Sequence, residues 1–180
     1  MLKWGIIGSG DVVDRLVQKS FLIKNISKVV SIYSDNYNQA NLLAKKHDLG
    51  TATKSLKSII LSKEINSIYI ATPPSSHAYY IKLFANNKKN ILCEKPLAIN
   101  EKDLLDIEKI CKKNKVSLIT SFYRRYLKRF IEIKKIIKNQ NIGKVITFNY
   151  RLFHSPKNHP TAPIKSNNSK STAWRFIKKI

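Results

Sequence analysis

Short apolar runs alternate with helical patterns along most of this sequence, and this alternation limits the fold more than any other feature. The apolar runs predict strands at residues 2–8, 29–33, 67–71, 90–93, 116–120 and 143–153. The helical spacing predicts helices at residues 11–22, 38–47, 55–62, 75–85, 100–113 and 125–138. Strands separated by such helices are typical of βαβ units. The sequence therefore predicts an α/β fold, with a doubly wound parallel sheet and right-handed crossovers.

The 180 residues suit one domain and the beginning of another. We place the boundary after residue 122, so that residues 1–122 form a nucleotide-binding domain. Residues 123–180 then hold a linking helix and the first strand of a second α/β domain. The alternation stops in residues 154–171, which we interpret as a loop. In the final stretch TAWRFIKKI, Trp174 and Phe176 are large apolar residues, and we expect these 180 residues to provide no core for them.

The charge is strongly basic, with 34 Lys and Arg against 11 Asp and Glu and a formal net charge of +23. Such a balance can indicate a nucleic-acid or anionic-surface binder. The lysines, however, occur as scattered pairs and do not form one stripe interleaved with aromatic residues. A lysine-rich solvated surface is the simpler interpretation, and we do not expect nucleic-acid binding to be the main function.

Two cysteines, Cys93 and Cys111, are too few for a disulfide framework, and no metal-ligand cluster stands out, so we predict no metal. No stretch approaches the length of a membrane span. The N-terminus enters a strand directly and lacks the layout of a signal peptide. A cytoplasmic protein without membrane association is the expectation.

The end of the first predicted strand has the context of a dinucleotide-binding turn. Gly8 permits a tight turn, Gly10 lets the backbone approach a pyrophosphate, and the following helix offers free N–H groups to phosphate. The third position of this fingerprint should be Gly or Ala but is Val13, so an ordinary turn between strand and helix stays an alternative. Asp11 is unusual beside an anion site, and its side chain can point to solvent or cap the helix. The candidate residues of this loop are Gly8, Ser9, Gly10, Asp11, Val12 and Val13.

In a dinucleotide-binding fold, a residue at the end of the second strand binds the adenosine ribose. Ser34 occupies that position and leaves room for a 2′-phosphate, whereas the neighbouring Asp35 would repel one if it points inward. No arginine follows to hold a 2′-phosphate. NAD and NADP both stay open as the cofactor.

The strand at residues 90–93 ends in Glu94-Lys95-Pro96. Charges at the end of a core strand are costly unless something binds there. Pro96 restricts Lys95, and the bond between them can be cis. This triplet therefore points to a binding site at the carboxyl edge of the sheet.

Several segments together resemble the Gfo/Idh/MocA oxidoreductases over essentially the whole chain. The matching segments are WGIIGSGDVVDR, IYIATPPSSHAYYIKLF, NILCEKPLA, SFYRRYLKRFIEIKKII and IGKV. The resemblance implies an N-terminal Rossmann domain, a C-terminal α/β domain with a large open sheet, and hydride transfer between NAD(P) and a sugar, cyclitol or related hydroxy/keto compound.

The resemblance also implies individual roles. Gly8 to Val13 would hold the pyrophosphate, and Ser34 and Asp35 would lie at the adenosine ribose. Other cofactor contacts would come from Thr72, Pro73, His77, Glu94 and Arg125. Lys95 would reach both the nicotinamide ribose and the reacting oxygen of the substrate, where a fixed ammonium stabilises developing negative charge. A surface role for Lys95 and a simple packing role for His77 are the alternatives.

Members of that family continue beyond a Trp-Arg pair like Trp174-Arg175 into an Asp-x-Gly-x-His-like segment that supplies the proton-transfer histidine. His154 and His159 do not match it. We therefore expect these 180 residues to bind the cofactor without full turnover, as an N-terminal fragment of an oxidoreductase. A non-catalytic nucleotide-binding module, or one half of a split enzyme, is the alternative. The substrate and the oligomer interface would depend on the rest of such an enzyme.

Overall fold

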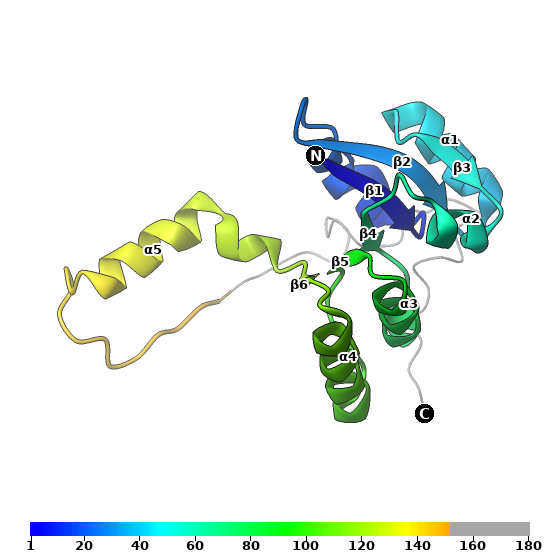
Figure 1. The fold of residues 1–180 in the computed structure, drawn as a ribbon. Helices are drawn as coiled ribbons and strands as arrows, with labels where there is room; N and C mark the ends of the chain where they lie inside the picture. Colours follow the sequence, from blue (N-terminus) through cyan, green and yellow to red (C-terminus); the bar gives the residue numbers. More distant parts are fainter. Residues whose placement is uncertain (152–180) are drawn as a thin grey trace, which may run out of the picture. The chain divides into compact units, whose positions relative to one another are not determined.

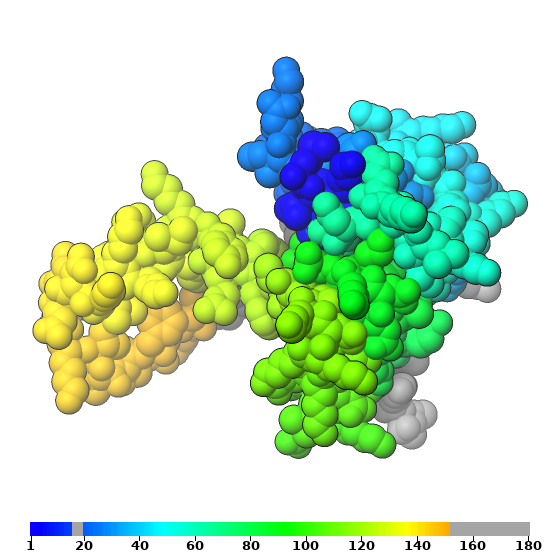
Figure 2. Space-filling view, viewed as in Figure 1, coloured from blue at the N-terminus to red at the C-terminus, as the bar shows by residue number. Residues whose placement is uncertain are grey.

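A computed structural model describes residues 1–151, without the side chains of residues 16–19. The chain divides into two compact units, Met1–Phe122 and a second that begins at Tyr123. In Figure 2 the first unit is the closely packed blue, cyan and green part of the molecule. None of the described helices is long and apolar enough to cross a membrane.

The first unit is built on a six-stranded sheet in which every pair of neighbouring strands is parallel (Figure 1). The strands are β1 (Leu2–Ile7), β2 (Ser27–Tyr33), β3 (Thr51–Thr53), β4 (Ser67–Ile70), β5 (Asn90–Cys93) and β6 (Leu118–Thr120). Their order is β3-β2-β1-β4-β5-β6, which is the order of a doubly wound Rossmann sheet. The predicted fold class is confirmed, and the order reverses between β1 and β4.

Helices cover both faces of this sheet. They are α1 (Tyr37–His47), α2 (Leu56–Leu61), α3 (Pro74–Asn86), α4 (Glu101–Asn114), the π-helical turn η1 (Val13–Val17) and the 3₁₀ turn η2 (Gln18–Phe21). Strand side chains alternate between the faces, so Ile6 packs with η1, η2 and α1, whereas Ile7 packs with α2, α3 and α4. Burial on both faces explains why the strands appear as continuous apolar runs.

Most predicted elements lie within a few residues of their expected positions, but the first helix differs in kind. Instead of a regular helix over residues 11–22, the chain forms η1 and then η2. The β-branched Val12 and Val13 at its start lower the preference for a regular α-helix. The sequence also gave no sign of β3, because its three residues, Thr-Ala-Thr, contain no apolar run.

The second unit, within residues 123–151, contains the 3₁₀ turn η3 (Tyr123–Tyr126) and helix α5 (Lys128–Lys138). The predicted strand at residues 143–153 is wrong for residues 143–151, which belong to no strand. A strand needs a neighbour for its N–H and C=O groups, and the described part of this unit contains none. Residues 152 and 153, the predicted loop at 154–171, Trp174 and Phe176 lie outside the described residues.

A polar contact fastens the start of the first helical segment to the end of α1. The Asp14 carboxylate oxygen Oδ1 accepts a hydrogen bond from Lys46 Nζ at 2.8 Å and lies 2.7 Å from His47 Nε2. The hydrogen bond with His47, and then that with Lys46, hold the pKa of Asp14 below its ordinary value of 3.8. The ionised form of Asp14 therefore stabilises the native state.

Replacing Asp14 by Asn should lower the free energy of unfolding by about 1 kcal/mol at pH 7. Because the folded-state pKa is lowered, this stabilisation is fully present above the unfolded-state pKa and is lost as the pH falls through the folded-state value. Urea unfolding of wild type and D14N, followed from neutral pH down to a pH below the folded-state pKa, measures it. Exposed Asp48 provides the control D48N; an equal effect in D48N, or a difference that persists in acid, would contradict the assignment.

Candidate dinucleotide site

The turn after β1 requires glycine at position 8. Gly8 has a φ of +105°, a conformation that residues with side chains rarely adopt. A Cβ atom there would lie 2.7 Å from the carbonyl oxygen of Ala71, which follows β4. The Gly8 N–H donates to the Tyr33 carbonyl at 2.8 Å. The turn is thus fixed between the ends of β2 and β4.

The start of the following helical segment presents unpaired backbone donors. Among the described residues, the N–H groups of Gly10, Asp11 and Val12 have no acceptor, whereas Val13 N–H donates to the Gly10 carbonyl at 3.0 Å. No atom lies closer than 4.0 Å to a Cβ built on Gly10, so the approach is open. Three free N–H groups at a helix start fit an anion such as pyrophosphate. Val13 is fully buried in the core, which shows how valine is accommodated at the third position.

The Asp11 side chain takes neither of the two expected roles, pointing to solvent or capping the helix, but forms an ion pair. Its Oδ1 lies 2.6 Å from Nε of Arg15, one turn further on. The ion pair offsets the carboxylate's charge beside the free N–H groups and brings a guanidinium to the same end of the helical segment. Sequence reasoning missed Arg15, although the i, i+4 spacing of Asp11 and Arg15 is a recognisable signal.

The end of β2 is tied to the turn through two serines. The Ser9 hydroxyl donates to Ser34 Oγ at 2.8 Å, and Ser34 Oγ also accepts the Asn36 N–H at 3.3 Å. The Asp35 carboxylate accepts a hydrogen bond from the Tyr33 hydroxyl at 3.3 Å. Burial, followed by the charge of Asp35, raises the pKa of Tyr33, which therefore stays a donor. None of the Lys and Arg side chains that the structure describes forms an ion pair with Asp35.

The end of β4 leads through Thr72 and Pro73 into α3. The Thr72 Oγ1 atom accepts the Ser76 hydroxyl at 2.7 Å, and Pro73 precedes the first turn of the helix. His77 is fully buried. Its Nδ1 lies 2.8 Å from the Pro96 carbonyl oxygen and its Nε2 lies 2.9 Å from that of Thr72. Both ring nitrogens of His77 thus contact main-chain carbonyl oxygens. Because the ring is buried, His77 can affect a cofactor only through the two loops that it joins.

The end of β5 places two charged neighbours in opposite environments. Glu94 is 9% exposed, whereas Lys95 is exposed and its ammonium has no ion-pair partner among the described residues. Glu94 Oε2 lies 3.4 Å from the Lys95 backbone nitrogen. The Lys95–Pro96 peptide bond is cis. A buried carboxylate therefore lies beside an exposed ammonium at the carboxyl edge of the sheet.

These strand ends meet along one edge. The Ala71 N–H donates to the Ile7 carbonyl at 2.8 Å, and the Glu94 N–H donates to the Ile70 carbonyl at 2.9 Å. The loops after β1, β4 and β5 therefore begin side by side, at the point where the strand order reverses. Ligands of open α/β sheets bind in this crevice. The residues present fit a dinucleotide, with free N–H groups at one end and a carboxylate and an ammonium at the other.

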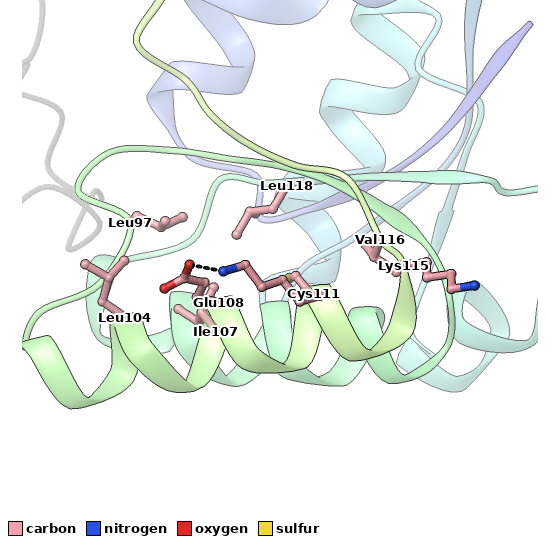
Figure 3. Close-up of a pocket in the computed structure, with 9 residues that line it drawn as sticks. Leu97, Leu104, Ile107, Glu108, Cys111, Lys115, Val116 and Leu118 are labelled. Carbon is pink, nitrogen blue, oxygen red and sulfur yellow. Dashed lines mark hydrogen bonds and ion pairs between the residues drawn. The ribbon is translucent and has the colours of Figure 1, made fainter.

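An apolar cavity of about 500 Å³ lies along α4 (Figure 3). Its lining residues are Leu97, Leu104, Ile107, Glu108, Cys111, Lys112, Lys115, Val116 and Leu118. Glu108 and Lys112 pair with each other in its wall. The cavity contains none of the predicted site residues and does not mark the cofactor site.

Arg125 belongs to the second unit, in the exposed turn η3. Its predicted place at the edge of the site stays a prediction. Within the described residues, no three His, Cys, Asp or Glu side chains are grouped as metal ligands. Cys93 and Cys111 are buried and unpaired, and burial raises the pKa of both thiols.

Comparison with known proteins agrees with this geometry. The NAD-binding Rossmann-fold model of the Gfo/Idh/MocA oxidoreductase family matches residues 2–122. The chain belongs to this family. Oxidoreductase P35 of Formosa agariphila is 29% identical over 99% of the chain and 54% of its own length. The scyllo-inositol 2-dehydrogenase (NADP(+)) IolU of Bacillus subtilis is 31% identical over 82% of the chain and 44% of its own length.

Among solved structures, the 3-ketoreductase KijD10 of Actinomadura kijaniata, in complex with NADP and TDP-benzene, superimposes with a TM-score of 0.71 at 17% identity. It matches 77% of this chain and 42% of its own. At that identity the likeness shows the fold alone. The chain spans about half the length of the relatives it matches.

Substituting Gly8 by Ala should destabilise the fold by about 2–4 kcal/mol, through the unfavourable φ and the clash with the Ala71 carbonyl. The matched variant G10A meets no atom within 4 Å other than one at that limit, and should change stability by less than about 0.5 kcal/mol. Urea unfolding of both variants measures the difference. Equal stability of G8A and G10A would show that the turn is not held as described.

Proposed function

We propose that residues 1–122 bind a nicotinamide dinucleotide and present it for hydride transfer to or from a sugar, cyclitol or related hydroxy/keto compound. One observation carries this proposal. Free N–H groups at positions 10–12 and the Glu94-Lys95 pair lie at the same carboxyl edge, on either side of the strand-order reversal. Membership of the family supports it. The complete activity is a property of a protein about twice this length, as in the relatives.

In this proposal the three free N–H groups bind the pyrophosphate, and Arg15 lies close to that end through its pair with Asp11. Ser34 and Asp35 face the adenosine ribose, and Thr72 and Pro73 line the middle of the cofactor. Glu94 lies at the nicotinamide ribose. When bound, the nicotinamide supplies or accepts the hydride.

Lys95 is the residue we assign to the reacting oxygen. Hydride transfer to a carbonyl builds negative charge on that oxygen, and an ammonium already in place stabilises the charge more in the transition state than in the ground state. Lys95 is exposed and has no ion-pair partner within residues 1–151, so its charge is available. Its neighbour Glu94 is buried and bonded, which anchors the backbone from which Lys95 projects.

NADH binding tests the proposal directly. The chain should bind NADH with a dissociation constant below about 1 mM, followed by the change in NADH fluorescence. G10A should weaken binding at least roughly tenfold, because a methyl group at Gly10 obstructs the approach of the phosphates. Its unchanged unfolding curve serves as the control for folding. A flat fluorescence response up to millimolar NADH would remove the proposed function.

The cofactor preference depends on Asp35 in a way that can be measured. A carboxylate without an ion-pair partner in the described part of the chain should repel a 2′-phosphate, so we infer a preference for NAD over NADP. D35N should raise the ratio of NADPH to NADH affinity by about tenfold. Fluorescence titration of both cofactors gives this ratio, and added salt should shrink the difference between wild type and D35N. An unchanged ratio would place Asp35 away from the ribose.

A further inference from the structure

Tyr69 carries a hydroxyl group between two buried isoleucines of its strand, Ile68 and Ile70. It lies on β4, is fully buried, and its ring packs against Phe21 with 5.0 Å between the ring centroids. Its hydroxyl donates to Glu94 Oε1 at 2.9 Å. A buried phenol needs a hydrogen-bond partner, and here the partner is one of the predicted site residues.

The sheet register explains how the two side chains meet. Tyr69 pairs with Leu92 on the neighbouring strand β5. Leu92 and Glu94 are two residues apart, so their side chains project to the same face of the sheet, and Tyr69 belongs to the core on that face. The long phenol spans the two-residue offset and reaches the carboxylate just beyond the strand end.

The hydrogen bond from Tyr69 holds the Glu94 carboxylate from the side of the core. Glu94 Oε1 is bonded to Tyr69, while Oε2 lies 3.4 Å from the Lys95 backbone nitrogen. Burial, and then the charge of Glu94, raises the pKa of Tyr69, so the hydroxyl keeps its proton and stays a donor. Of the two contacts, that with Tyr69 is the shorter and the one made by a side chain that the core immobilises.

We propose that Tyr69 is a positioning residue for the cofactor site: its hydroxyl fixes the Glu94 carboxylate at the nicotinamide-ribose end. This inference rests on the proposed function. Tyr69 does not touch the cofactor itself, because it is fully buried beneath Glu94. The competing interpretation is that the hydrogen bond only satisfies a buried phenol and affects stability alone.

Binding of two ligands separates these interpretations. Tyr69→Phe keeps the ring and its packing on Phe21 but removes the hydroxyl. It should weaken NADH binding roughly three- to tenfold, the effect of one lost hydrogen bond to a charged group. ADP occupies only the adenosine and pyrophosphate end, so its dissociation constant should stay within about twofold. Isothermal titration calorimetry measures both ligands. The exposed Tyr79 provides the matched control Tyr79→Phe.

A double-mutant cycle tests whether Tyr69 acts through Glu94. In the background Glu94→Ala the hydroxyl has no carboxylate to hold, so adding Tyr69→Phe should not weaken NADH binding further. Additive losses would overturn the proposal, as would equal weakening of NADH and ADP by Y69F. Normal NADH binding by Y69F would overturn it while leaving the proposed function intact. Absence of NADH binding by the wild type would remove both, so the two failures are distinguishable.

Discussion

The close approach of Gly8 to the Ala71 carbonyl is the constraint on which the rest of this structure depends. It brings the ends of β1 and β4 together at the point where the strand order reverses. Beyond the last paired residues, backbone hydrogen bonds continue from strand to strand: Gly8 to Tyr33, Ala71 to Ile7, Glu94 to Ile70, and Ser121 to Cys93. Each loop therefore begins at a defined position relative to the neighbouring strand. These positions determine how the residues of the candidate site are arranged.

The few acidic side chains serve local purposes in a chain with three times as many basic ones. Asp11 pairs with Arg15 beside the free N–H groups, Asp14 joins the first helical segment to α1, and Glu94 accepts a hydrogen bond from Tyr69. Each of these carboxylates has a named partner within the first unit. Among the described residues, many lysine ammonium groups have no such partner. The net charge therefore says little about the site, whose character depends on individual contacts.

The sequence was sufficient to predict the fold class, because strands that are buried on both faces of a sheet appear as continuous apolar runs. It predicted β5 to the residue, and it predicted a helix over residues 100–113 where the structure has α4. The Asn100 side chain caps this helix by accepting the Asp103 N–H at 2.8 Å. Local patterns failed where structure depends on partners distant in sequence. The three residues of β3 become a strand only beside β2. Residues 143–151 alternate like a strand, yet no neighbouring strand is described for them.

The same reasoning explains which residues of the candidate site the sequence could predict. Gly8, Glu94 and Lys95 stand at strand ends, where glycine and charge are visible against an apolar background. Tyr69 was missed because tyrosine is an ordinary strand residue, and only the register with β5 brings its hydroxyl to Glu94.

Glu94 and Lys95 differ in environment, although they are neighbours at the carboxyl edge of the sheet. Glu94 is bonded from the core by Tyr69, and the carbonyl of Pro96 on the other side of Lys95 contacts the buried ring of His77. The backbone on both sides of Lys95 is thus held, while its ammonium is exposed and has no ion-pair partner in residues 1–151. When the backbone of a lysine is held and its ammonium is unpaired, little reorganisation is needed as negative charge develops nearby. For this reason the contacts of Tyr69 and His77, which lie beneath the surface, bear on the role that we propose for Lys95.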